Sequence, residues 1–325
     1  MRRHDLPLAG GSPIGRRSVL LGGVALLAAG CATGGYRGPE RKVTIAAGER
    51  GGFYLAFAQL LAAEITKAEP DLHCEAVVTE ASVANVTQLR EGTVDLGLVL
   101  ADVAQSAVLG QEPFTAPVPL HALGRVYENY LQVVVRADGP VRDLAGLAGR
   151  PVAIGSRFSG AAFLAQRLLT VSGIEVQPST LLLDDALAAL RERRVDALVW
   201  SGGVPTPAIA ELDRETPIRL LALDRALPVL RSVHGPVYEQ VRVPASAYEG
   251  VGDVPTIGTA NLLACSPALP DDVAAAVVRV LVNHAADLVP AEAVGAQFLD
   301  VRTLIGTGEV PLHPGAVRTY RELHG

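Results

Sequence analysis

The stretch GERGGFYLAFAQLLAAEI, residues 48–65, decides the fold that we expect. It follows the apolar run VTIAA and places a glycine-rich turn directly before a helix-like segment. A buried strand, a glycine turn and a helix begin a parallel strand–helix–strand unit. The backbone N–H groups of Gly52, Phe53 and Tyr54 are then left without partners at the positive end of the helix, where an anion could bind. The alternative is a turn that holds no ligand.

The same alternation of strands and helices continues along the chain and predicts two such units. The predicted strands are nearly continuous apolar runs, as burial on both faces of a sheet requires. In the first unit we expect strands at 43–47, 74–78 and 94–100, and helices at 52–66, 82–91 and 102–109. In the second unit we expect strands at 151–155, 180–183, 196–200 and 218–223, and helices at 160–172, at 184–193 and after Pro205.

Two crossings are expected to join these units. Residues 123–136 read as a strand that leaves the first unit and enters the second, and a return crossing is expected near 241–256. The strand 257–265 and the amphipathic helix 270–288 would then rejoin the first unit. The predicted fold class is therefore α/β and two-lobed, with a mostly parallel sheet flanked by helices in each lobe. Residues 41–129 with 250–325 would form the first lobe, and 130–249 the second.

The N-terminus reads as an export signal. Residues 1–30 contain an apolar run of about a dozen residues, too short for the roughly twenty of a membrane-spanning helix. Arg16 and Arg17 resemble a twin-arginine signal, and LAAGC at 27–31 resembles a lipobox with Cys31 as the lipidated residue. Plain secretion is the alternative. We expect residues 31–40 to be a flexible tether and the protein to be extracytoplasmic and membrane-anchored, at the cell surface or in the periplasm.

Composition argues against nucleic-acid binding. The formal net charge is −6, and removal of residues 1–30 leaves −9 with only Lys42 and Lys67 as lysines. Binding to the phosphate backbone of a nucleic acid requires clustered Lys and Arg. After lipidation Cys74 and Cys265 remain, and they could form one disulfide or stay as two buried thiols.

A second stretch, TEASVAN at 79–85, adds hydroxyl and amide groups to the expected cleft. Thr79 closes a predicted strand, and Ser82 is placed to cap the next helix. In parallel sheets ligands sit where strands end and helices begin. Thr79, Ser82 and Asn85 could therefore converge with the first helix end on one ligand.

Several motifs in order then resemble a known family. They are GERGGFY at 48–54, TEASVAN at 79–85, GTVD at 92–95, DVA at 102–104, LQVVV at 131–135, DLAGLAGRPV at 143–152, GVPTP at 203–207 and VPASAY at 243–248. Over roughly residues 41–290 the chain is similar to the TAXI family of TRAP-transporter solute receptors. The resemblance implies a type II periplasmic-binding fold whose lobes close by hinge motion around a small, often carboxylate-bearing solute. It also implies delivery of that solute to a TRAP membrane permease.

The expected ligand contacts come from both units. They are Gly52, Phe53, Tyr54, Thr79, Ser82, Asn85, Asp102, Tyr127, Ser156, Arg157, Ser159, Gly160, Gly203 and Pro205.

The second unit departs from the family pattern in one loop. Where Gly-Ser-Gly-Thr is usual, the chain has Phe158-Ser159-Gly160-Ala161, so we expect a smaller and less polar pocket. Arg157 could offset this by supplying a cation, or it could be a solvated loop residue. Dicarboxylate specificity therefore does not follow from the resemblance.

Enzyme motifs are absent from the sequence. The seven histidines show no HxH, HxxH or HExxH spacing, and neither CxxC nor GxSxG occurs. We therefore expect no catalytic residues, no metal, no cofactor and a monomeric receptor for a small organic-acid or amino-acid-like solute. The alternatives are a lipoprotein that presents its ligand to a membrane sensor kinase and, less expected, an exported enzyme on the same fold.

The lipobox generates a first prediction. Cys31→Ser removes the thioether-forming sulfur, so the variant is expected in the soluble exported fraction while the wild type sediments with membranes. Fractionation and immunoblotting of both proteins measure this. A Cys31→Ser protein that stays with the membranes contradicts the lipid anchor.

Overall fold

The structure is a computed structural model that describes residues 35–290 and 299–324. The predicted signal peptide, Cys31 and the first residues of the predicted tether lie outside this range. Tyr36, inside the tether, packs against the first-lobe core and donates its backbone N–H to Glu69 Oε2 at 2.6 Å. No helix in the described part of the chain is both long and apolar enough to cross a membrane.

The described residues form one ten-stranded sheet that runs through the whole molecule. Its strand order is β2-β1-β3-β10-β4-β7-β5-β6, with β8 paired to β4 and β9 to β10. The strands are β1 Arg41–Ala46, β2 Leu72–Val77, β3 Leu96–Leu100, β4 His121–Arg136, β5 Pro151–Ala153, β6 Gln177–Ser179, β7 Ala197–Gly202, β8 Ile218–Leu220, β9 Tyr238–Val243 and β10 Val254–Cys265.

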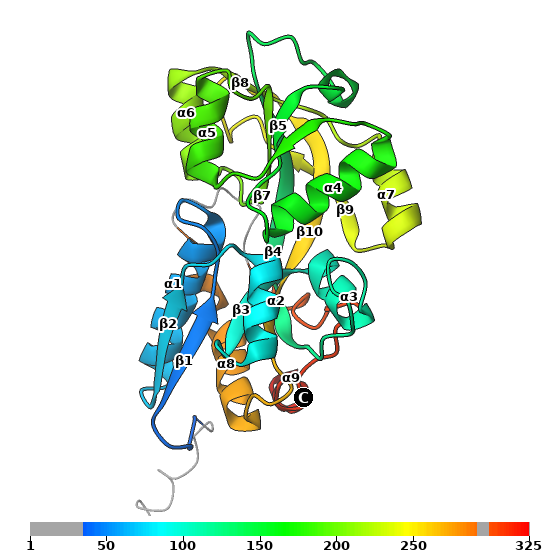
Figure 1. Ribbon diagram of the computed structural model, residues 1–325. Coiled ribbons are helices and arrows are strands. Elements are labelled where there is room, and N and C mark those ends of the chain that lie inside the picture. The colour runs from blue at the N-terminus through cyan, green and yellow to red at the C-terminus, as the bar shows by residue number, and fades with distance from the viewer. Residues whose placement is uncertain (1–34, 291–298, 325) are drawn as a thin grey trace, which may run out of the picture.

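Helices cover this sheet in both halves of the molecule (Figure 1). They are α1 Phe53–Ala68, α2 Ser82–Glu91, α3 Ala101–Leu109, α4 Gly160–Ser172, α5 Leu183–Arg191, α6 Pro207–Glu215, α7 Leu227–His234, α8 Asp271–Asn283 and α9 Pro314–His324. Two short 3₁₀ turns, Leu144–Leu147 and Ala285–Asp287, complete the set.

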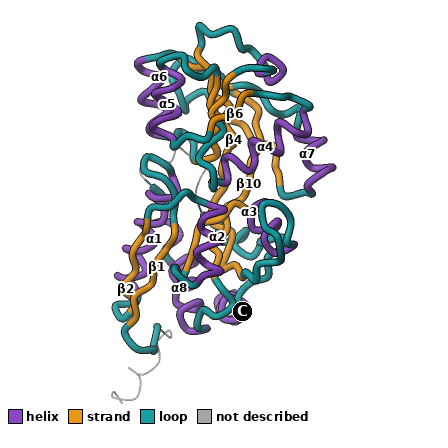
Figure 2. Tube along the Cα trace, in the orientation of Figure 1, coloured by secondary structure: helices purple, strands orange, loops and turns teal. Residues whose placement is uncertain are grey.

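The two long strands β4 and β10 join the two lobes (Figure 2). β1 lies parallel to β2 and β3 in the first lobe, and β5 lies parallel to β6 and β7 in the second. β4 and β10 pair antiparallel to each other from His121 to Tyr130, and beyond that point β4 pairs with β7. The prediction of a two-lobed α/β fold with two crossings is confirmed. Each lobe also carries antiparallel pairs, because the crossing strands run against its parallel ones.

Each lobe has its own apolar core. In α1, Phe57, Leu61 and Ile65 recur at helical spacing and are fully buried or nearly so. The same core contains Val277 and Leu281 of α8, which packs against α1. Helix α8 therefore completes the first lobe, as hydrophobic faces of helices must be covered.

Some element boundaries differ from expectation. The predicted strand at 180–183 is wrong, because β6 ends at Ser179 and Leu183 already begins α5. The run of three leucines reads as a strand, but Asp184 and Asp185 stabilise the positive end of a helix there. The return crossing is β10 itself, which starts at Val254, and the predicted helix 270–288 ends at Asn283. Helices α7 and α9 were not predicted.

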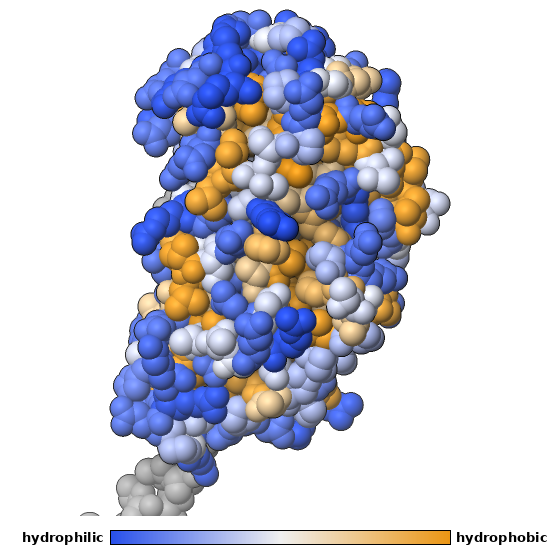
Figure 3. Space-filling model, viewed as in Figure 1, coloured by the Kyte–Doolittle hydropathy of each residue, from blue (hydrophilic) through white to orange (hydrophobic). Residues whose placement is uncertain are grey.

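Hydrophobic side chains show in several places on the face in Figure 3, including its right-hand edge, where Figure 1 places α7. Val229 and Val233 of α7 are 47% and 61% exposed. Cys74 and Cys265 are both free thiols, so the disulfide alternative is not realised between them.

Core packing of α1 gives the second prediction. Leu61→Ala, at a site with no exposure, is expected to lower the free energy of unfolding by about 2–5 kcal/mol. Leu109→Ala makes the same change on α3 at a side chain that is 47% exposed, and it should cost less than about 0.5 kcal/mol. Urea unfolding followed by circular dichroism measures both. Equal losses would contradict the placement of α1 in the core.

Candidate functional site

A small cavity of about 30 Å³ lies between the lobes. This volume suits roughly one water molecule, so the lobes are closed on each other. It is lined by residues of both lobes, namely Gly48, Glu49, Gly52, Phe53, Tyr54, Ala81, Ser82, Leu100, Asn129, Ser159, Gly160, Ala161, Trp200, Ser201 and Gly202. Among the described lining residues Glu49 alone carries a formal charge at neutral pH.

The N-terminus of α1 forms one side of the cavity. Gly51 has a positive φ of 74°, which favours glycine, whereas Gly52 is extended with φ −91°. A Cβ at position 52 would fit tightly, at 3.4 Å from Trp200 and 3.2 Å from the Glu49 carbonyl. Gly52, Phe53 and Tyr54 line the cavity, so the positive end of α1 faces it. The prediction that the Gly52 N–H lacks a partner is wrong, because this group donates to the Glu49 carbonyl at 3.3 Å.

The N-terminus of α4 faces the same space from the second lobe. Ser159 caps this helix by accepting the Ala162 N–H at 3.0 Å, and its hydroxyl donates to the Ser156 carbonyl at 2.8 Å. Gly160 and Ala161, in the first turn, line the cavity. Two helix N-termini from different lobes thus converge, and backbone dipoles rather than cationic side chains make the cavity favourable for an anion.

The carboxyl end of β7 supplies groups that the sequence reading missed. Trp200 and Ser201 line the cavity, with Asn129 of β4 beside them. The Ser201 Oγ is buried without a hydrogen-bond partner among the described residues, so it is available to a ligand. The chain has a single tryptophan, and its position at a strand end was the available signal.

The N-terminus of α2 is occupied by the protein itself. The Val83 and Ala84 N–H groups donate to the Phe158 carbonyl of the second lobe at 3.0 and 3.2 Å. The predicted capping role of Ser82 is wrong, because Ala81 holds the cap position and Ser82 Oγ accepts the Leu100 N–H at 3.0 Å. Ser82 Oγ also lies 3.3 Å from the Tyr54 hydroxyl, at the cavity wall.

Thr79 and Asn85 serve the first lobe instead of the cavity. The Asn85 side-chain amide is fully buried and donates to the carbonyls of Ala47 and Leu98 at 2.7 and 2.8 Å. The Thr79 hydroxyl donates to Asn85 Oδ1 at 2.6 Å. Neither residue lines the cavity. Their polar atoms are used to join β1, α2 and β3, because buried polar groups need partners.

The loop before α4 does not narrow the cavity as expected. The Phe158 side chain is 45% exposed, and the exposed Arg157 lies over its ring with the guanidinium carbon 5.4 Å from the ring centre. Neither side chain lines the cavity. The expected loss of polarity is seen only at Ala161.

Three further predicted contacts lie beside the cavity without lining it. Tyr127 packs against the Phe53 and Phe57 rings, each with centroids 4.9 Å away. Gly203 permits close approach to α1, since a Cβ there would lie 2.4 Å from the Phe53 ring. Pro205 follows in the same loop and also does not line the cavity.

Glu49 bridges the two lobes with its carboxylate. Its Oε1 accepts the Ser156 hydroxyl at 2.5 Å, and its Oε2 accepts the Leu183 N–H at the start of α5 at 2.9 Å. Burial raises the pKa of Glu49, and these hydrogen bonds act against that rise. Ser156, predicted to bind the ligand, is therefore engaged by the protein's own carboxylate.

Asp102 forms a second bridge between the lobes. It is fully buried on α3 and accepts the Tyr238 hydroxyl of β9 at 3.0 Å and the Val103 N–H at 2.8 Å. Arg167 of α4 donates to Tyr238 Oη at 2.9 Å and to Ser106 Oγ of α3 at 2.8 Å. Burial raises the pKa of Asp102 to about 6, and Arg167 opposes the rise. Asp102 holds α3 against the second lobe and does not line the cavity.

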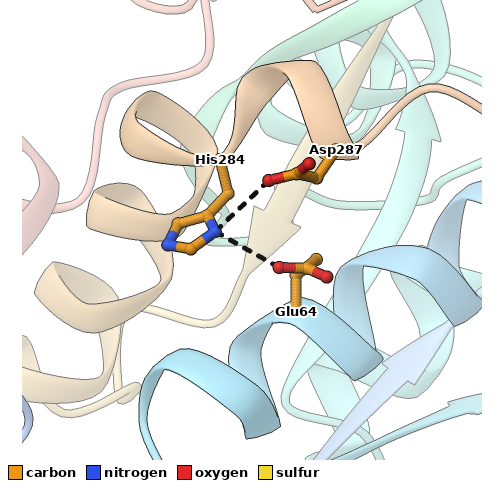
Figure 4. Close-up of side chains that lie close together, drawn as sticks. All are labelled: Glu64, His284 and Asp287. Carbon is orange, nitrogen blue, oxygen red and sulfur yellow. Dashed lines mark ion pairs between the residues drawn. The ribbon is translucent and has the colours of Figure 1, made fainter.

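Among the described residues, one group of potential metal ligands lies where α1 meets the end of α8 (Figure 4). His284 Nδ1 is 3.2 Å from Glu64 Oε2 and 3.6 Å from Asp287 Oδ2. Lys67 Nζ lies 3.1 Å from Glu64 and already supplies a positive charge to this cluster. These contacts join α1 to the end of α8.

A family comparison agrees with this architecture. The model of the NMT1-like family matches residues 45–323. The chain belongs to the NMT1-like family. This is a family of extracytoplasmic solute-binding proteins, not of enzymes.

Solved structures show the same fold at low identity. MatC from Rhodopseudomonas palustris with bound malate is 16% identical with a TM-score of 0.52, and the match covers 88% of this chain and 98% of that one. A protein from Bordetella bronchiseptica RB50 is 17% identical with a TM-score of 0.53, covering 88% and 90%. The alkanesulfonate-binding protein SsuA from Xanthomonas axonopodis pv. citri, bound to MOPS, is 17% identical with a TM-score of 0.48, covering 88% and 85%. The fold is the α/β type II periplasmic-binding architecture.

The Asp102 bridge gives the third prediction. Its folded-state pKa of about 6 lies above the ordinary value of 3.8, so the folded protein binds more protons between these limits. The stability contributed by Asp102 is therefore present at low pH and lost as pH rises through about 6. Relative to Asp102→Asn, the wild type should lose about 1–3 kcal/mol of unfolding free energy between roughly pH 4 and pH 7.

Urea unfolding at several pH values measures this difference. Asp138→Asn is the control, because the exposed Asp138 has a pKa lowered to about 2 by hydrogen bonds from Arg136 and Arg193. The unfolding free energy of Asp138→Asn should change with pH in the same way as that of the wild type over this range. If the unfolding free energy of Asp102→Asn also changes with pH as that of the wild type does, the raised pKa of Asp102 is contradicted.

Proposed function

We propose that this protein is an extracytoplasmic receptor that binds a small, carboxylate-bearing solute between its lobes and delivers it to a TRAP-type permease. The observation that carries the proposal is the convergence of the α1 and α4 N-termini on one interlobe cavity. An anionic group there would accept hydrogen bonds from backbone N–H groups of both lobes at once. Binding would then favour the closed arrangement over an open one.

The proposed solute contacts follow from the lining of the cavity. Of the residues expected from the sequence, Gly52, Phe53, Tyr54, Ser82, Ser159 and Gly160 line it, and we add Trp200 and Ser201. We propose that Thr79, Asn85, Asp102, Tyr127, Ser156, Arg157, Gly203 and Pro205 support the site from outside it. MatC, of similar fold, holds malate, which bears carboxylates.

The partner and the anchoring are parts of the same proposal. The ordered motifs between residues 48 and 248 support a TAXI receptor, and LAAGC at 27–31 supports export by a twin-arginine signal and lipidation at Cys31. We propose a monomer with lobes at 41–129 plus 250–325 and at 130–249. A sensor kinase is the alternative partner, and a neighbouring kinase gene in place of a permease gene would favour it.

The single tryptophan makes binding directly measurable. Trp200 lines the cavity, so solute binding is expected to change its fluorescence and to raise the melting temperature. At a hundredfold excess over the dissociation constant, a ligand stabilises the folded state by about 2.7 kcal/mol. A screen of organic acids, amino acids and small sulfonates tests the chain from residue 33 onward. If no anionic compound changes either signal, the proposal fails.

Ser201 provides the fourth prediction. Ser201→Ala removes a buried hydroxyl that lacks a partner in the described structure, so the free protein should not lose stability. Affinity for a solute found in the screen should fall by about 1–3 kcal/mol if that hydroxyl is its partner. Calorimetry of both proteins measures the change.

Ser172→Ala is the matched control. The Ser172 Oγ is also buried without a partner in the described structure, but Ser172 ends α4, away from the cavity. Its replacement should leave the affinity unchanged. Equal affinities for all three proteins would remove Ser201 from the site.

A further inference from the structure

Glu49 places a negative charge at a cavity that is otherwise built for an anion. The residue is 7% exposed, and its carboxylate accepts hydrogen bonds from two sides, from the Ser156 hydroxyl at 2.5 Å and the Leu183 N–H at 2.9 Å. Both donors belong to the second lobe, so lobe closure brings this charge into place. Among the described residues that line the cavity, no Lys, Arg or His stands opposite it.

We infer that Glu49 is a specificity-determining residue that restricts the interlobe site to solutes with a single negative charge. The inference rests on the proposed function. The first carboxylate of a solute would occupy the space at the α1 and α4 N-termini. A second carboxylate would then lie close to Glu49, where like charges repel strongly because Glu49 is buried.

Glu49 also occupies the place where a second carboxylate could otherwise bind. The α5 N-terminus and the Ser156 hydroxyl form an anion-binding arrangement in the second lobe, and Glu49 already accepts both donors. The α2 N-terminus is likewise taken, by the Phe158 carbonyl. Of the helix ends gathered at the lobe interface, those of α1 and α4 are left for the solute.

Three four-carbon probes isolate the charge at one end of the solute. Butanoate, 4-aminobutanoate and succinate share a carboxylate and differ at the far end by a methyl, an ammonium or a second carboxylate. For the purified exported protein we expect succinate to bind about tenfold or more weakly than butanoate, and 4-aminobutanoate at least as tightly as butanoate. Trp200 fluorescence titration at pH 7 gives the dissociation constants.

Glu49→Gln tests the residue itself. Gln keeps the shape and one acceptor oxygen, and it should raise the succinate-to-butanoate affinity ratio about tenfold. Glu80→Gln is the control, since Glu80 is exposed, carries the same charge and lines the outer groove beside Glu49 instead of the cavity. Its ratio should stay within about twofold of the wild type.

The possible outcomes separate this inference from the proposed function. If succinate binds the wild type as tightly as butanoate, or if Glu49→Gln shifts all three probes equally, Glu49 is only a bridge between lobes and the inference is overturned. The wild-type comparison decides this even if Glu49→Gln does not fold. If none of the probes binds either protein, the proposed solute class fails and the inference fails with it.

Discussion

The antiparallel pairing of β4 with β10 is the constraint on which the rest of the structure depends. Both strands run through the two lobes, and polar side chains along them bond to each other, as when Asn261 Nδ2 donates to Asn129 Oδ1 at 2.9 Å. Asn261 Oδ1 in turn accepts the Tyr54 hydroxyl, which fixes the first turn of α1 to the crossing strands. The crossing strands therefore lie beneath the site and belong to both lobes. Bending of these strands changes the distance between the α1 and α4 N-termini.

Closure of the lobes depends on polar contacts as well as on apolar packing, since Phe163 of α4 lies in one buried cluster with Val83 and Leu100 of the first lobe. Glu49, the Phe158 carbonyl and Asp102 each cross between lobes, and all three accept hydrogen bonds from the opposite side. Each such bond is worth about 0.5–1.5 kcal/mol net, or about 1.5–3 kcal/mol where the acceptor is charged, because water would satisfy the same groups when the lobes separate. The balance between open and closed arrangements is thus fine enough for a solute to shift it.

The sequence predicted the architecture well because burial on both faces leaves a direct pattern in the strands. α2 was predicted at its observed limits, 82–91, since a polar turn and a glycine bound it. The lining of the cavity follows from the sequence in part. Glycine before a helix marks an accessible N-terminus and points to Gly52 and Gly160, whereas Trp200 and Ser201 carry only the weaker signal of a strand end. Asn85 and Asp102 were assigned to the ligand, although buried polar groups first satisfy the backbone and side chains around them.

Because Glu49 is negatively charged, the cavity can attract an anion with backbone N–H groups but not with a cationic side chain. An arginine or lysine in the same space would pair with that carboxylate on closure, and the resulting ion pair would fill the cavity and hold the lobes shut without solute. Backbone N–H groups at the α1 and α4 ends cannot move toward Glu49, because their helices hold them in place. A site built from helix dipoles can therefore remain open to a solute while an acidic residue beside it bridges the lobes. The positive ends of two helices and the negative charge of Glu49 act as separate, fixed parts of one recognition surface.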